Sequence, residues 1–166
     1  IGLNAHIEHA YHALAIDERR KPFLPSMWTR PHNWSGTLEQ VWFPGVHSNV
    51  GGSYSPDGLA NEALQWMVEK AENLGLEFDA THLGHYLPCF NSNLNDSMTT
   101  FYKLMGPVQR TLGDHAGHGE AVHQSALDRR NLPECAYDPD NLKSYLTSGS
   151  APVVNTNRIA RGTPCT

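Results

Sequence analysis

The pattern of apolar and polar positions predicts a helix at the start of the chain. Between residues 7 and 14, apolar side chains recur at the i, i+3, i+4, i+7 spacing that places them on one helix face. These positions are Ile7, Ala10, Tyr11 and Leu14. Pro22 cannot continue a helix, so we expect an amphipathic helix that ends before it. Asp17 and Glu18 near that end oppose the helix dipole, so the adjacent arginines are expected to pair with them.

Residues 38 to 43 have the composition of a buried strand. The run contains β-branched and aromatic side chains, including Val41 and Trp42. Pro44-Gly45 then ends it with a turn. His47 follows just beyond the C-terminal end of this strand, where ligands bind in open α/β sheets. We therefore expect His47 in a loop that presents a catalytic base, and a buried turn histidine bonded to backbone groups is the alternative.

The remaining elements are mostly helices and loops. Apolar residues recur at helical spacing from Leu59 to Leu74, and Gly75 lies where a left-handed helix end is expected. Shorter helices are predicted near residues 79 to 86 and 139 to 146. Residues 26 to 37 and most of the chain after residue 88 read as loops. A strand joined to helices predicts an α/β fold, and 166 residues fit one domain.

Composition narrows the range of partners. The chain has 12 Lys and Arg against 17 Asp and Glu, and its net charge of -5 argues against a nucleic-acid-binding surface. No apolar run approaches the roughly 20 residues that span a bilayer, so no transmembrane segment is expected. The three cysteines are too widely spaced for a zinc site and suit a reducing, cytoplasmic compartment, although one pair could form a bridge in a secreted protein. The cysteines are Cys89, Cys135 and Cys165.

Two segments carry a family resemblance. Residues 12 to 23, His-Ala-Leu-Ala-Ile-Asp-Glu-Arg-Arg-Lys-Pro-Phe, and residues 41 to 52, Val-Trp-Phe-Pro-Gly-Val-His-Ser-Asn-Val-Gly-Gly, resemble the signature stretches of an α/β-hydrolase domain family. That family is related to the phospholipase effectors of type VI secretion systems. The likeness continues through residues 64 to 68 and, more weakly, to Asp96-Ser97, Tyr102, Arg110 and residues 120 to 125. In the last stretch Gln124 replaces the family's usual proline. The resemblance covers roughly residues 6 to 145.

The resemblance implies ester hydrolysis by serine, histidine and aspartate, with lipid or phospholipid substrates and no cofactor. It makes His47 the general base. The family's nucleophile lies on a Gly-x-Ser-x-Gly elbow before the histidine, and no serine of this sequence has glycine two residues before and after it. We therefore expect residues 1 to 166 to be the C-terminal part of a larger hydrolase domain whose upstream part supplies the serine. The resemblance also implies an upstream acid, with Asp17 as the alternative within the chain; Asn49 stands where the family often has aspartate.

Two further interpretations stay open. Five potential metal ligands lie within ten residues, but the glycines among them favour a polar surface loop, and no metal site is predicted. They are Asp114, His115, His118, Glu120 and His123.

The loop tryptophans Trp28 and Trp34 could line an acyl-chain cleft, and peripheral membrane contact is compatible with such a cleft. A binding or assembly module without catalysis is the alternative to the hydrolase, and a metal-dependent hydrolase is the third hypothesis.

Overall fold

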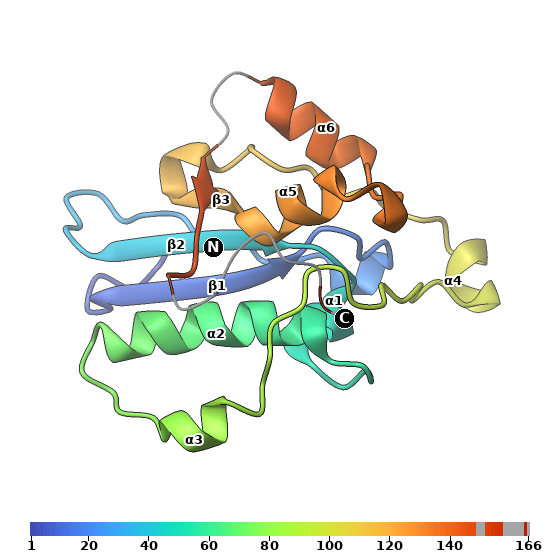
Figure 1. Cartoon of the computed structure of the whole chain (residues 1–166). Helices are drawn as coiled ribbons and strands as arrows, with labels where there is room; N and C mark the ends of the chain where they lie inside the picture. Colours follow the sequence, from blue (N-terminus) through green and yellow to red (C-terminus); the bar gives the residue numbers. More distant parts are fainter. Residues whose placement is uncertain (149–151, 158–164, 166) are drawn as a thin grey trace.

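A parallel four-stranded sheet with helices on both faces forms the centre of the protein (Figure 1). The computed structural model describes residues 1–148, 152–157 and 165. The strands, in spatial order, are β1 (His9–Ala15), β2 (Thr37–Phe43), β3 (Glu120–His123) and β4 (Val153–Val154). All three pairings are parallel. The α/β fold expected from the sequence is therefore confirmed.

The helices vary in length and cover the sheet unequally. The longer ones are α2 (Gly58–Glu72), α5 (Gln124–Asn131) and α6 (Asp140–Thr147), and the short ones are α1 (His47–Gly51), α3 (Ala80–Leu83) and α4 (Thr100–Leu104). Single 3-10 turns are η1 (Lys21–Phe23), η2 (Ala116–His118) and η3 (Pro133–Cys135). Figure 1 shows α2 on one side of β1 and β2, and α5 and α6 on the other.

Two apolar clusters fill the space between the sheet and these helices. Because side chains alternate along a strand, Trp42 of β2 packs in the cluster that includes Leu142 and Tyr145 of α6. Its neighbours Val41 and Phe43 pack in the cluster that includes Trp66 of α2. The strand is buried on both faces, as expected where helices cover both sides of a parallel sheet. The predicted strand at residues 38 to 43 and the helix ending before Gly75 are confirmed.

The helix predicted between residues 7 and 21 is wrong, because β1 occupies residues 9 to 15. Ala10 and Leu14 are buried as the helical spacing required, but Ala15 and Ile16 are buried too. A short, almost continuous apolar run of this kind suits a strand covered on both faces, and periodicity alone does not separate it from a buried helix. Pairing of β1 with β2 over seven positions decides the outcome.

The glycine-rich stretch that the sequence predicts as a polar surface loop contains a buried strand instead. Residues 120 to 123 form β3, whose four residues are all buried between β2 and β4. Gly119 immediately before it has φ 74, and a Cβ there would lie 1.9 Å from the Leu38 carbonyl oxygen. Glycine is therefore required where the chain enters the sheet.

A disulfide joins Cys89 and Cys165, whose Cα atoms are 5.8 Å apart, while Cys135 is a free thiol. The bridge is the alternative that the sequence left open for the cysteines. None of the helices in the described ranges has the length and apolar character needed to cross a membrane.

Candidate active site

His47 lies at the carboxyl end of the sheet, close to where the sequence placed it. Strand β2 ends at Phe43, the chain turns through Gly45 with φ 108, and His47 begins the short helix α1. The residue thus opens a helical turn instead of lying in an open loop. Its side chain is 42% exposed, so a base at this position remains accessible to solvent and substrate.

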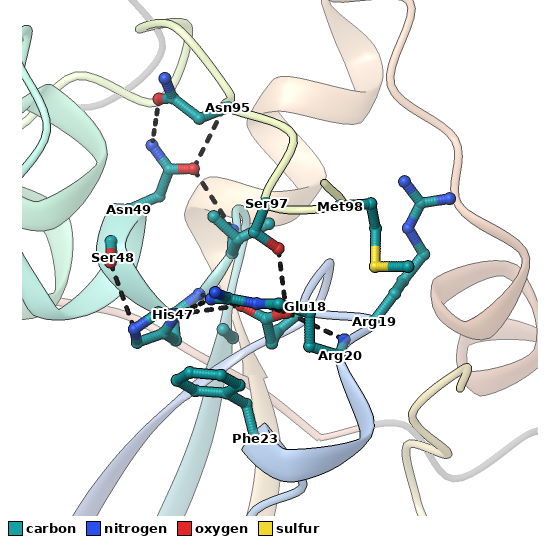
Figure 2. A network of polar contacts seen from close by, with 12 residues as sticks. Glu18, Arg19, Arg20, Phe23, His47, Ser48, Asn49, Asn95, Ser97 and Met98 are labelled. Atoms are coloured by element: carbon teal, nitrogen blue, oxygen red, sulfur yellow. Dashed lines mark hydrogen bonds and ion pairs between the residues drawn. The ribbon is translucent and has the colours of Figure 1, made fainter. Parts of the chain in front are cut away.

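A buried carboxylate contacts the inner nitrogen of this histidine. Nδ1 of His47 lies 2.9 Å from Oε2 of Glu18, whose side chain is fully buried (Figure 2). The backbone N–H of His47 points at the same oxygen over 3.4 Å. Glu18 follows β1, and His47 follows β2, so parallel pairing of these strands brings both residues to one edge of the sheet. The contact therefore follows from the topology of two neighbouring strands.

Arg20 and Ser97 hold the other sides of the Glu18 carboxylate. Arg20 donates from Nε to Oε1 at 2.9 Å and from Nη2 to Oε2 at 2.8 Å, and its backbone N–H donates to Oε1 at 3.0 Å. The hydroxyl of Ser97 donates to Oε1 at 2.9 Å. Burial alone would raise the pKa of Glu18, but the hydrogen bonds from Arg20, His47 and Ser97 hold that pKa well below its ordinary value of 4.5. Glu18 is consequently an anion at neutral pH.

The tautomer of His47 decides what its outer nitrogen can do. Nδ1 also lies 2.7 Å from Nη2 of Arg20, so it can either donate to Glu18 or accept from Arg20. If Nδ1 carries the proton and donates to Glu18, Nε2 has a free lone pair and can accept a proton. If Nδ1 accepts from Arg20, Nε2 carries the proton and is no base. In the first tautomer, the Ser48 hydroxyl, 3.2 Å from Nε2, donates to that lone pair.

A tilted contact with an aromatic ring restricts the imidazole of His47. The ring of Phe23 lies 4.6 Å from the ring of His47, centroid to centroid, at an interplanar angle of 36°. The guanidinium of Arg20 lies 3.9 Å above the centre of the same phenyl ring, within the range of a cation–π contact. Phe23 belongs to η1, which Lys21 and Pro22 begin. The proline expected to stop a helix therefore begins the turn that delivers this phenyl ring to the site.

Asp17, the acid that the sequence offered within the chain, points away from His47. Its Oδ2 accepts hydrogen bonds from the backbone N–H of Gly45 at 2.6 Å and from the hydroxyl of Tyr137 at 2.9 Å. Burial raises the pKa of Asp17 despite these hydrogen bonds. Successive side chains in extended backbone point in opposite directions, so Glu18 reaches His47 and Asp17 does not. Asp17 instead links the turn at Gly45, which precedes His47, to Tyr137, which follows η3.

Asn49 has a structural role in the same region. Its Oδ1 accepts from the backbone N–H groups of Val46 at 3.3 Å and Asn95 at 3.1 Å, and its Nδ2 donates to Asn95 Oδ1 at 3.0 Å. The amide thereby links α1 to the loop that carries Ser97 (Figure 2). Donor and acceptor are both needed here, and a carboxylate would supply only acceptors.

Sequence reasoning did not find Glu18, Arg20 or Ser97 as site residues. Two signals were available: the signature stretch of residues 12 to 23, which contains Glu18 and Arg20, and the weaker family likeness at Asp96-Ser97 and Tyr102. These residues do converge on the site: Asp96 pairs with Arg19 at 3.0 Å, and the ring of Tyr102 lies 6.5 Å from that of Phe23.

The five candidate metal ligands do not come together. Glu120 is buried and accepts from the Trp42 indole N–H at 2.7 Å and from two backbone N–H groups of the preceding loop. His123 is 1% exposed and His118 accepts from the Arg30 backbone N–H. Within the described residues, no group of three or more His, Cys, Asp or Glu side chains is arranged to hold a metal ion. This histidine-rich segment therefore does not supply the set of ligands that a metal-dependent hydrolase would need.

The two loop tryptophans lie away from His47. Trp34 donates its indole N–H to the carbonyl of Ile7, just before β1 begins, and Trp28 stacks on His12 at 4.7 Å between ring centroids. His47 follows the opposite, carboxyl end of β2. Of the two interpretations that the sequence left open for these tryptophans, the contacts favour a structural role.

Comparisons with known proteins relate the first part of the chain to phospholipases. Residues 1–70 match the family model described as type VI secretion system (T6SS) phospholipase effector Tle1-like, catalytic domain. This stretch contains Glu18, Arg20 and His47. A Saccharomyces cerevisiae protein described as uncharacterized protein YEL023C is 41% identical over 46 residues, which are 25% of this chain and only 7% of that relative. No solved structure matches.

Proposed function

We propose that this chain supplies the catalytic base and its orienting carboxylate to a serine-type hydrolase of lipid esters, phospholipids in particular. The observation that carries the proposal is the contact between His47 Nδ1 and Oε2 of the fully buried Glu18 side chain, on a histidine whose own side chain is 42% exposed. The match of residues 1–70 to a phospholipase effector catalytic domain supports the substrate class.

In the proposed reaction, Nε2 of His47 takes the proton from a serine hydroxyl as the serine oxygen bonds to the ester carbonyl carbon. The same nitrogen then gives that proton to the leaving alcohol oxygen, and the C–O bond breaks. A water molecule repeats the two steps and releases the fatty acid. Glu18 stays ionised throughout, because its pKa is held low, and stabilises the imidazolium that forms.

Arg20 and Ser97 serve this reaction as positioning residues. Their hydrogen bonds occupy Oε1 and part of Oε2, so the remaining lone pair of Oε2 is directed at Nδ1 of His47. In the tautomer that the proposed reaction uses, Nδ1 donates to this carboxylate and Nε2 is unprotonated. The Phe23 ring limits rotation of the imidazole out of this arrangement.

The nucleophile of the proposed reaction belongs to a part of the protein outside residues 1 to 166, since none of these residues forms a Gly-x-Ser-x-Gly elbow. Two features support an additional segment beside β1. Strand β1 pairs with β2 along one edge, and no strand among the described residues pairs with the other. A largely apolar cavity of about 600 Å³ lies beside Ala13 of β1, between Val50 of α1 and Leu64 and Met67 of α2. A strand and helix added there would bring a serine toward α1.

The test uses the full-length protein and vesicles of phosphatidylcholine. We expect release of free fatty acid, covalent labelling by a fluorophosphonate on a serine outside residues 1 to 166, and loss of both in His47→Gln. Ser48→Ala is the matched control: it removes the hydroxyl next to Nε2 and should still be labelled. Absence of hydrolysis and of labelling in a folded protein would refute the proposal and favour a binding module without catalysis.

A further inference from the structure

Helix α4 and the residue after it present apolar side chains to solvent. Phe101 is 65% exposed, Leu104 85% and Met105 48%, and α4 contributes no buried residue. Figure 1 shows α4 projecting from the body of the protein, away from α2 and α3. An exposed apolar group on a projecting element is typical of a surface that contacts another apolar phase.

This apolar tip adjoins the candidate active site. Tyr102, on the inner side of α4, lies 6.5 Å from Phe23 between ring centroids and 5.1 Å below the Arg20 guanidinium. Phe23 in turn stacks on His47. The loop that enters α4 also carries Ser97, which donates to Glu18. One short path of contacts thus joins the apolar tip to the histidine.

The charge around the tip is opposite to that of the whole chain. The side chains near α4 and η1 include five cations and three anions; the cations are Arg19, Arg20, Lys21, Lys103 and Arg110, and the anions are Asp17, Glu18 and Asp96. The chain as a whole has a net charge of -5. Lys21 and Lys103 are both exposed. Cations that flank exposed apolar side chains match the headgroups of an anionic bilayer above its acyl chains.

We propose that the α4 tip, defined as Phe101, Leu104 and Met105, docks on an anionic lipid surface together with Lys103 of α4 and Lys21 of the neighbouring η1. The apolar side chains enter the boundary between headgroups and acyl chains, and the two lysines contact anionic headgroups. Docking places the open side of His47 against the membrane, where phospholipid esters are concentrated. The biological meaning rests on the proposed function, but docking itself involves no chemistry and is measurable without it.

The binding test uses the full-length protein carrying His47→Gln, so that no substrate is consumed, and sedimentation with vesicles of phosphatidylcholine containing phosphatidylglycerol. The tip variant is Phe101→Ser with Leu104→Ser. The matched control is Leu76→Ser with Leu87→Ser, which removes leucines that are 57% and 70% exposed elsewhere. We expect roughly tenfold weaker binding or more for the tip variant, from loss of two membrane-inserted side chains. The control should bind as the parent does.

A charge variant separates the two parts of the surface. Lys103→Glu should weaken binding to vesicles that contain phosphatidylglycerol and leave weak binding to pure phosphatidylcholine unchanged. Equal binding by the tip variant and the control overturns the proposal. So does a tip variant that binds vesicles normally but changes the oligomeric state, because the tip is then a protein contact.

A last comparison uses the protein with His47 intact and a soluble short-chain ester. The tip variant should hydrolyse it at the parent rate and lose activity only on vesicles. If the parent lacks esterase activity while the tip variant still binds vesicles poorly, the hydrolase proposal fails and the docking proposal stands.

Discussion

Two histidines follow neighbouring strands at the same edge of the sheet, yet their surroundings differ sharply. His47 follows β2, is 42% exposed, and contacts the buried anion of Glu18 through Nδ1. His123 ends β3 and is 1% exposed; its Nδ1 lies 2.8 Å from the Ser125 hydroxyl and its Nε2 3.0 Å from the Thr156 hydroxyl. It also stacks on Phe43 at 4.5 Å between centroids.

The comparison shows that topology alone does not make a histidine a base. Parallel strands deliver both residues to an edge where ligands bind in open sheets. At His123, both nitrogens contact buried hydroxyls, so the ring serves as a packed, hydrogen-bonded part of the core. At His47, Nδ1 faces a buried carboxylate and Nε2 faces the Ser48 hydroxyl, on a side chain that is 42% exposed. Burial and the charge of the partner therefore separate the candidate base from the structural residue.

Removing each imidazole tests this difference most strongly. If the full-length protein is the proposed hydrolase, His47→Ala should lower kcat on the order of 10³-fold or more, because a nucleophile without its general base loses most of the joint effect of the catalytic group. The melting temperature should change little, since His47 is partly exposed. Kinetics on vesicles and thermal unfolding of the same preparations provide the measurement. Near-normal turnover would make His47 another structural histidine.

The next largest effect concerns two neighbouring carboxylates. Glu18→Gln keeps the shape of the side chain but removes its charge, and should lower kcat on the order of 10²-fold because the imidazolium loses its counter-ion. Asp17→Asn is the paired control, since Asp17 bonds Gly45 and Tyr137 instead of His47. It should alter stability more than kcat. Equal kinetic losses in the two variants would contradict the assignment of Glu18.

His123→Phe should affect stability instead of chemistry. The phenyl ring keeps the stack on Phe43 but leaves the buried hydroxyls of Ser125 and Thr156 without the imidazole nitrogens. We expect a loss of about 1–3 kcal/mol in the free energy of unfolding, the usual cost of buried polar groups that lose a hydrogen-bonding partner. Urea unfolding measures this loss. The kcat per folded molecule should stay within about twofold of the parent, because His123 takes no part in the proposed reaction. A large kinetic loss without destabilisation would assign His123 to the reaction.

The smallest expected effect is a difference in pH dependence between Asp17 and Glu18. The pKa of Glu18 is lowered in the fold, so its contribution to stability is present above its ordinary value of 4.5 and is lost as the pH falls toward the folded pKa. The pKa of Asp17 is raised, so its contribution is present below its ordinary value of 3.8 and is lost as the pH rises.

The unfolding free energy of each variant relative to the parent should therefore move in opposite directions with pH. The deficit of Glu18→Gln should shrink on acidification through pH 4.5, while Asp17→Asn should gain on the parent as the pH rises above 3.8. Denaturant unfolding across this range measures both, and parallel curves would show that the two carboxylates have the same environment.

The elements that sequence predicted well have strong local signals. The strand at residues 38 to 43 has a β-branched and aromatic run closed by Pro44-Gly45, and α2 repeats its apolar face over four turns. His47 could be placed because it directly follows that strand. The apolar run of β1 fits both periods and so predicts a helix equally well, and only its pairing partner 28 residues away in sequence identifies it as a strand.

The rest of the site depends on contacts that no local pattern encodes. Glu18 and Asp17 are adjacent acids, and their roles are separated by the direction in which each leaves the end of β1. Ser97 is 79 residues from Glu18 in sequence. Strand β3 is four residues long, and its partners β2 and β4 come from distant parts of the chain. Such features follow from the parallel topology, which a single sequence does not specify.

The most direct test of the central claim is a double-mutant cycle on kcat with His47→Gln, Glu18→Gln and the double variant in the full-length protein. If Glu18 acts through His47, the double variant should lose no more activity than His47→Gln alone, because a carboxylate cannot orient an absent imidazole. Losses that multiply, so that the double variant is slower than His47→Gln by the whole Glu18→Gln factor, would show that the two residues act independently and would contradict this account.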